Sequence, residues 1–99
     1  MIEDKIDPKL KKKWVKALLS GDYAQGRRQL YDKKSDTHCC LGVLARVMGY
    51  SDDQLDGRAM LSSLEEVPLS KKMEVEFVYM NDGHEMPFDL IAGFINEYL

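Results

Sequence analysis

Two adjacent cysteines and two histidines are the side chains with the most potential for covalent chemistry. Cys39 and Cys40 directly follow His38, and His84 is the other imidazole of the chain. The cysteines stand where a helix is expected to begin, and the N–H groups at a helix N-terminus stabilise a thiolate. A cysteine nucleophile would also need an imidazole within hydrogen-bond reach, and sequence alone places neither histidine better than the other. The alternative, which we favour, is that both cysteines are small buried apolar residues.

The same four side chains have the chemistry of metal ligands. The cysteines of a structural zinc site are typically two or more residues apart, and adjacent cysteines do not fit that spacing. An acidic stretch with Asp52, Asp53 and Asp56 lacks the spacing and the terminal glutamate of a calcium-binding loop. We therefore predict no metal site and no cofactor, and a solvated loop for the acidic stretch.

The segment from Tyr23 to Arg27 is the most site-like loop of the sequence. Gly26 would let the backbone approach a ligand closely, and Gln25 and Arg27 carry directional hydrogen-bond donors. An equally good alternative is that Tyr23 and Gln25 hold the loop to the following hairpin by bonding backbone groups. The residues predicted to bind a ligand or a partner are Tyr23, Gln25, Gly26, Arg27, Arg28, His38 and Cys39.

A basic segment near the amino terminus raises the question of nucleic-acid binding. Its cations, together with two later arginines, are Lys9, Lys11, Lys12, Lys13, Lys16, Arg27 and Arg28. Such a set could bind phosphates, and an exposed Trp14 could stack on a base. However, Trp14 shares an apolar helical stripe with Leu10 and Leu18, which predicts a core position. The lysines are then expected to form a solvated helix face.

Three helices are expected to position these residues. Asp7 and Pro8 predict the start of the first helix and Gly21 its end, since these residues suit an N-cap, a first turn and a left-handed stop. The apolar spacing over residues 40–48 predicts a second, buried helix that ends at Gly49. Pro87 opens the last helix, whose apolar face is formed by Ile91, Phe94, Ile95 and Tyr98.

The segments between these helices have weaker signals. Residues 27–31 and 37–40 flank a polar interval and predict a small β-hairpin. Residues 51–57 are acidic and loop-like, and a short helix is expected over residues 62–66, before a proline.

Residues 73–80 fit either a strand or a helix. Val75, Phe77 and Tyr79 alternate with glutamates as in a half-buried strand, whereas Ser70 and Gly83 would suit the two ends of a helix. The overall prediction is a mainly α α+β fold, with about four helices, one of them short, and a small hairpin between the first two.

Length and composition indicate one globular domain over residues 1–99. The chain is 44% hydrophobic and 31% charged, and it has no apolar run long enough to span a bilayer. The amino terminus has no apolar signal segment and the cysteines form no disulfide framework, so we expect an intracellular protein. Residues 1–50 carry a net charge of +5 and residues 51–99 a net charge of −8. The two halves could attract each other within the fold, steer a charged partner, or pair in a homodimer.

Three segments together resemble a known set of proteins. They are Trp14-Val-Lys-Ala-Leu-Leu-Ser-Gly-Asp-Tyr-Ala-Gln-Gly-Arg27, His38-Cys-Cys-Leu-Gly-Val-Leu44, and Met80-Asn-Asp-Gly83 leading into Phe88-Asp-Leu-Ile-Ala-Gly-Phe-Ile95. In this order they resemble an uncharacterised family of small proteins from tailed-phage and bacterial genomes. The resemblance covers most of the chain apart from residues 50–70, implies no chemistry, and favours a helix over residues 71–80. This chain departs from the family pattern at His38, at Arg28, where glycine is common, and at Met86-Pro87, where Ser or Thr usually opens the last helix.

These observations predict a small phage accessory protein that acts in the host cytoplasm by binding a host protein or a small ligand, without catalysis. No convincing acid–base set supports an enzyme. One alternative is a nucleic-acid-binding module that uses the basic first helix, which predicts salt-sensitive binding. Another is a cysteine-dependent enzyme, which predicts a thiol with a depressed pKa. No membrane partner is expected.

Overall fold

The computed structural model describes residues 6–61, 64 and 68–99. In chain order its elements are α1 (Pro8–Ser20), β1 (Tyr31–Asp32), β2 (Thr37–His38), α2 (Cys40–Val47), α3 (Asp52–Leu55), α4 (Lys71–Val78), a π-helical turn η2 (Tyr79–Gly83) and α5 (Phe88–Tyr98). The two short strands are antiparallel and pair Tyr31 with His38 and Asp32 with Thr37. The predicted fold class is confirmed, because the described part of the chain is mainly helical and its hairpin lies between the first two helices.

α1 begins and ends at the residues that its sequence predicts. The Asp7 carboxylate accepts a hydrogen bond of 3.2 Å from the Leu10 N–H, and Pro8 occupies the first turn. Gly21 ends the helix with φ +82°, a conformation that costs glycine little. Trp14 is fully buried on the inner face, so its predicted core position is confirmed.

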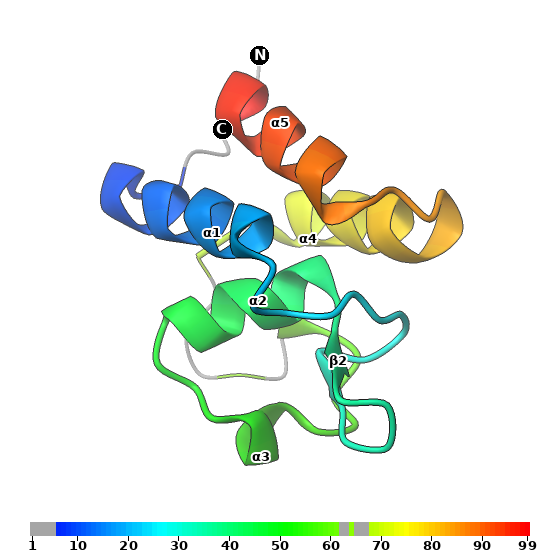
Figure 1. The fold of residues 1–99 in the computed structure, drawn as a ribbon. Helices are drawn as coiled ribbons and strands as arrows, with labels where there is room; N and C mark the ends of the chain where they lie inside the picture. Colours follow the sequence, from blue (N-terminus) through cyan, green and yellow to red (C-terminus); the bar gives the residue numbers. More distant parts are fainter. Residues whose placement is uncertain (1–5, 62–63, 65–67) are drawn as a thin grey trace.

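α2 is the central helix of the molecule, with α1 packed against it and α4 on another side (Figure 1). Every residue from Cys40 to Ala45 is buried. A Cβ atom at Gly42 would overlap the carbonyl group of Leu30, so glycine lets the chain before the hairpin lie directly on this helix. The Trp14 indole N–H donates a hydrogen bond of 2.9 Å to the Cys40 carbonyl and ties α1 to the first turn of α2.

Residues 71–80 are helical, as the family resemblance implies, and the helical turn continues to Gly83. The Ser70 hydroxyl accepts a hydrogen bond of 3.1 Å from the Met73 N–H and caps α4. Phe77 is fully buried, whereas Val75 and Tyr79 are exposed, which is a helical and not an alternating pattern. The last turn widens into η2, which ends at Gly83.

The acidic segment 51–57 is not the continuous loop that we predicted, because it contains α3. The Ser51 hydroxyl accepts from the Gln54 N–H while the Gln54 side chain accepts from the Ser51 N–H, which is a complete capping box. The hairpin strands are also shorter than predicted, with two residues each. The short helix expected over residues 62–66 lies, apart from Leu64, outside the described residues.

The core lies between α1, α2, α4 and α5. α5 runs alongside α1, so the first and the last helix of the chain are neighbours (Figure 1). Trp14 and Phe77 are at the centre, with ring centroids 5.0 Å apart, and Phe94 packs edge-on against Phe77 at 5.7 Å. None of the helices in the described part of the chain is long and apolar enough to cross a membrane.

Candidate functional site

Gln25, the central residue of the predicted binding loop, is bonded internally. Its amide nitrogen donates to the Asn81 side-chain oxygen at 2.9 Å and to the Met86 carbonyl at 2.7 Å. Its amide oxygen accepts from the Phe88 N–H at 3.1 Å. These bonds hold the loop against η2 and the start of α5. Gln25 therefore holds the loop in place by bonding backbone groups, as in the alternative given above. These backbone groups belong to Met86 and Phe88 and not to the hairpin.

Asn81, which sequence reasoning missed, is the partner that makes this anchor possible. The side chain is fully buried, and its oxygen also accepts from the Cys40 N–H at 3.1 Å. Its nitrogen donates to the Gly26 carbonyl and to the Asp82 carboxylate, both at 2.8 Å. One amide thus joins the loop, the start of α2 and η2. The sequence signal was a polar residue on the inner face of the predicted helix.

Gly26 lets the loop pack closely against the hairpin. A Cβ atom at this position would overlap the side chain of Thr37 in β2. Its N–H donates a hydrogen bond of 2.7 Å to the His38 carbonyl, and the His38 N–H donates in turn to the Ala24 carbonyl at 2.9 Å. The loop is therefore hydrogen-bonded to β2 through its backbone.

The two arginines of the predicted site face acidic residues of the second half of the chain. The Arg27 guanidinium lies 3.4 Å from the Glu85 carboxylate in an exposed ion pair. Arg28 has φ +72°, and its N–H donates to the Asp82 carboxylate at 3.0 Å. These contacts join the basic and the acidic halves within the fold.

Both cysteines are buried, Cys39 at the N-cap of α2 and Cys40 in its first turn. Burial raises the pKa of the Cys39 thiol to about 11 and that of Cys40 well above its ordinary value. Desolvation of the thiolate therefore outweighs the stabilisation by the helix N-terminus. The Cys40 thiol lies 3.7 Å from the Phe77 carbonyl, and the His84 ring contacts Tyr79 at a centroid distance of 4.5 Å. A reactive thiol needs the opposite pKa shift.

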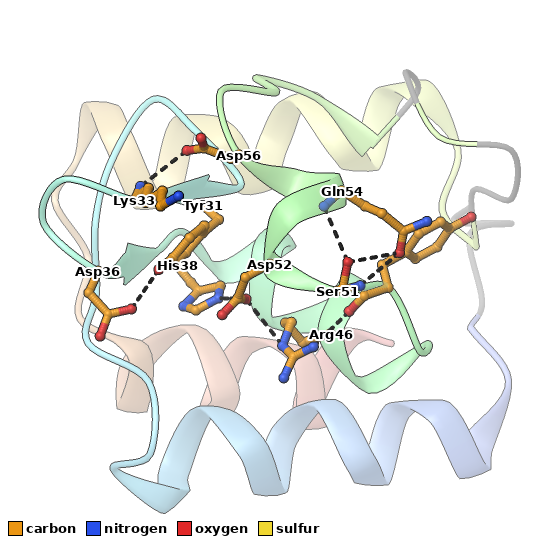
Figure 2. A network of polar contacts seen from close by, with 10 residues as sticks. Tyr31, Lys33, Asp36, His38, Arg46, Ser51, Asp52, Gln54 and Asp56 are labelled. Atoms are coloured by element: carbon orange, nitrogen blue, oxygen red, sulfur yellow. Dashed lines mark hydrogen bonds and ion pairs between the residues drawn. The ribbon is translucent and has the colours of Figure 1, made fainter.

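His38 is the centre of a second polar cluster (Figure 2). Its side chain is buried, and Nε2 lies 2.7 Å from Asp52 Oδ1 in α3. Arg46 Nε approaches the same oxygen at 3.2 Å, and Arg46 Nη1 donates to the Tyr50 carbonyl at 2.9 Å. Asp52 thus holds an imidazole from β2 and a guanidinium from α2 together. The capping box at Ser51 starts α3 and brings this carboxylate into position.

Two tyrosine rings enclose the His38 imidazole. Tyr23 meets it edge-on with centroids 5.0 Å apart, and Tyr31 lies against it at 4.7 Å. The Tyr31 hydroxyl donates to the Asp36 carboxylate at 2.8 Å, and this hydrogen bond raises the pKa of Tyr31 to about 12. In the described part of the chain, no three His, Cys, Asp or Glu side chains are grouped so that they could hold a metal ion.

Tyr23 also lines a shallow groove between the second half of α1 and the end of α2. The groove has a volume of about 360 Å³, and its lining residues are Lys13, Lys16, Ala17, Ser20, Asp22, Tyr23 and Val47. Of the predicted site residues, only Tyr23 belongs to it. The groove therefore lies beside the His38 cluster (His38, Asp52, Arg46 and the two tyrosines) and contacts it through the Tyr23 ring.

Lysines continue from the groove along the outer side of α1. The spacing of Lys9, Lys12, Lys13 and Lys16 puts them on one helical face, and all four are exposed. We call this set the lysine face. None of the four forms an ion pair with another residue in the described ranges.

Comparison with known proteins identifies a family that is described as a domain of unknown function. The family described as "Domain of unknown function (DUF8296)" matches residues 6–56, slightly more than half of the chain. No curated protein and no solved structure matches the chain. The matched range runs from α1 to the end of α3 and includes all the residues labelled in Figure 2. The chain therefore belongs to the DUF8296 family of domains of unknown function.

Proposed function

We propose that this protein is a small phage accessory protein that works in the host cytoplasm as a binding module, without catalysis. Its target is a host protein or a small ligand with an acidic surface. The observation that carries this proposal is the lysine face of α1, four exposed cations without ion-pair partners among the described residues. The phage origin rests on the resemblance of the three sequence segments.

The buried polar groups support binding over catalysis. The thiols have raised pKa values, and Gln25 and Asn81 use their amides for internal bonds. The His38 imidazole is enclosed by two tyrosine rings and bonded to Asp52. A general base must reach the proton that it abstracts, and these groups are directed inward.

Nucleic acid is the second candidate target, because a lysine face would also attract phosphates. Two observations weaken this candidate. Trp14 is fully buried and cannot stack on a base, and Arg27 is paired with Glu85. Salt-sensitive binding without an aromatic platform would then depend on the lysines and on Arg28.

Affinity capture from a bacterial host lysate tests the proposal. The bait proteins are the wild type, the double variant Lys13→Glu/Lys16→Glu, and a matched control, Lys71→Glu/Lys72→Glu, which changes two exposed lysines at the start of α4 by the same charge. We expect a stoichiometric target that the wild type and the control retain and the α1 variant loses. Retention of nuclease-sensitive material alone would favour the nucleic-acid alternative. A target that all three baits retain equally would contradict the lysine face as the binding surface.

A further inference from the structure

The groove beside the lysine face has the chemistry to recognise one kind of partner. We propose that it anchors an aliphatic or aromatic side chain of an acidic peptide segment, whose carboxylates pair with Lys13 and Lys16. This inference rests on the proposed binding function and names the chemical class of its partner.

The groove offers an apolar surface. Ala17, Val47 and the Tyr23 ring line it, and all three are partly exposed. Its volume of about 360 Å³ lies at the lower end of the range for sites that bury a small ligand. Covering these groups with an apolar side chain removes their surface from water, which favours binding.

The groove's cations specify the charge of the occupant. The Ser20 hydroxyl is already used, because it donates to the Ala17 carbonyl at 2.7 Å and accepts from the Asp22 N–H at 3.1 Å. The ammonium groups of Lys13 and Lys16 have no ion-pair partner among the described residues. A partner must therefore bring acceptors, and a carboxylate is the acceptor that a protein segment supplies most directly.

The His38 cluster holds the groove in its shape. Tyr23 packs edge-on against His38 at 5.0 Å, and the Asp52 carboxylate fixes His38 at 2.7 Å. Arg46 holds Asp52 from α2, the helix that also supplies Val47. A lining that is ordered before binding loses little conformational entropy when a partner arrives.

A protein segment fits this groove better than a nucleic acid does. Its lining includes the aliphatic side chains of Ala17 and Val47, and the Asp22 carboxylate stands on it as well. Ala17 and Val47 present aliphatic surface, which suits an apolar side chain better than a base, and the Tyr23 ring is the one aromatic group among the described lining residues. The Asp22 carboxylate repels phosphates and carboxylates alike and does not separate the two kinds of partner. An apolar side chain of the peptide covers the aliphatic part of the lining, and the carboxylates on either side of it pair with the lysines.

Fluorescence polarisation with short labelled peptides tests the inference on the full chain. The probes are acetyl-Glu-Glu-Leu-Glu-Glu amide, the same peptide with serine in place of leucine, and an oligothymidylate of similar charge. We expect the leucine peptide to bind the wild type about tenfold more tightly than the serine peptide, since a buried apolar side chain contributes about that factor or more. Tighter binding of the oligothymidylate would overturn the assignment to a peptide.

Two pairs of variants locate the binding. Ala17→Gln fills the groove with a good helix former and should abolish the preference for leucine, whereas Leu19→Gln changes an exposed residue of the same helix and should preserve it. Lys13→Gln/Lys16→Gln should weaken both peptides more than Lys9→Gln/Lys12→Gln does. Thermal unfolding of each variant shows that it is folded.

The outcomes separate this inference from the proposed function. Equal, lysine-dependent binding of both peptides would contradict the groove as the site of an apolar side chain but leave the lysine face as a binding surface. Binding of neither peptide by the wild type would also contradict the groove as a peptide-binding site. If capture of the host target is also independent of Lys13 and Lys16, both proposals fail. A dimer in sedimentation velocity that Ala17→Gln abolishes would assign the groove to a second copy of this chain.

Discussion

Arg28 has a backbone conformation that an arginine does not favour. Its φ of +72° lies in the left-handed region, and its N–H is held there by the Asp82 carboxylate at 3.0 Å. A left-handed conformation costs a residue with a Cβ atom about 1 kcal/mol or more, and glycine adopts it freely. Glycine, which is common at this position in the proteins that the chain resembles, thus fits the structure better than arginine.

We predict that Arg28→Gly raises the free energy of unfolding by about 0.5–1 kcal/mol, because relief of strain exceeds the added entropy of the unfolded chain. Urea denaturation measures the change. Arg27→Gly is the matched control, since Arg27 has no positive φ and loses its ion pair with Glu85. This control should not be stabilised. A less stable Arg28→Gly protein would show that the arginine side chain contributes more than the strain costs.

The buried thiols make the stability of the protein depend on pH in the alkaline range. Folding raises the pKa of Cys39 from 9.0 to about 11, so the unfolded state loses its proton first as the pH rises. The thiol therefore stabilises the fold fully below pH 9, and this contribution falls as the pH rises toward 11. We expect the free energy of unfolding to fall by about 1 kcal/mol from this group between about pH 8 and pH 10.

Urea denaturation at these two pH values measures that fall. Cys39→Ala should reduce the pH dependence, whereas the part that comes from Cys40 remains. An equal fall in the wild type and in Cys39→Ala would assign the effect to other groups. Slow reaction of both thiols with an alkylating reagent in the native protein is the accompanying expectation.

Single residues also show where sequence reasoning reaches its limit. The burial of Trp14 followed from its apolar neighbours at helical spacing, which is a local signal. Gln25 was singled out for its directional hydrogen bonds, but its partner is Asn81, 56 positions later in the chain. His38 was selected for its nearness to the cysteines, and its actual partner is Asp52. The sequence contains these polar residues but not the distances between them.

At the scale of the elements, two glycines in helices have opposite roles. Gly42 in α2 allows the Leu30 carbonyl to lie against the helix, whereas a Cβ atom at Gly93 in α5 would meet nothing within 4 Å. Helix propensity alone favours alanine over glycine at both positions by up to about 1 kcal/mol. The close contact at Gly42 reverses that preference.

We predict that Gly42→Ala lowers the free energy of unfolding by about 2 kcal/mol or more, because α2 and the Leu30 backbone must move apart. Gly93→Ala, the matched control, should raise it by up to about 1 kcal/mol. Thermal or urea denaturation measures both variants. A neutral effect at Gly42 would mean that the contact relaxes at little cost.

Elements with residues that mark their ends were predictable from sequence. α1 has Asp7, Pro8 and Gly21, and both of its ends agree with the structure. α3 was missed although Ser51 and Gln54 have the spacing of a capping box, because the acidic composition of the segment favoured a loop. The helix over residues 71–80 required the family resemblance, since its periodicity fits a strand equally well.

At the scale of the whole molecule, the core crosses the boundary of the region that matches the family. Trp14 lies within residues 6–56, but the Phe77 ring against which it packs and the buried face of α5 lie outside this range. Asn81 also bonds the Cys40 N–H from outside it. The matched region therefore lacks a large part of its own core.

We predict that a fragment of residues 1–60 does not fold, because an isolated helix of the length of α1 is marginal in water and the faces that cover it are missing. Far-ultraviolet circular dichroism of the fragment, beside the full chain, should show little helix and no cooperative thermal transition. A cooperative transition in the fragment would show that residues 1–60 form an independent folding unit.

The pairing of α1 with α5 has a consequence for the timing of folding during synthesis. α1 is translated early, but α5, one of the helices that it packs against, is translated near the end of the described chain. Contacts between residues so far apart in sequence must wait until the intervening chain has been made. On the ribosome, the nascent protein therefore presents the part of α1 that α5 covers to chaperones until α5 emerges.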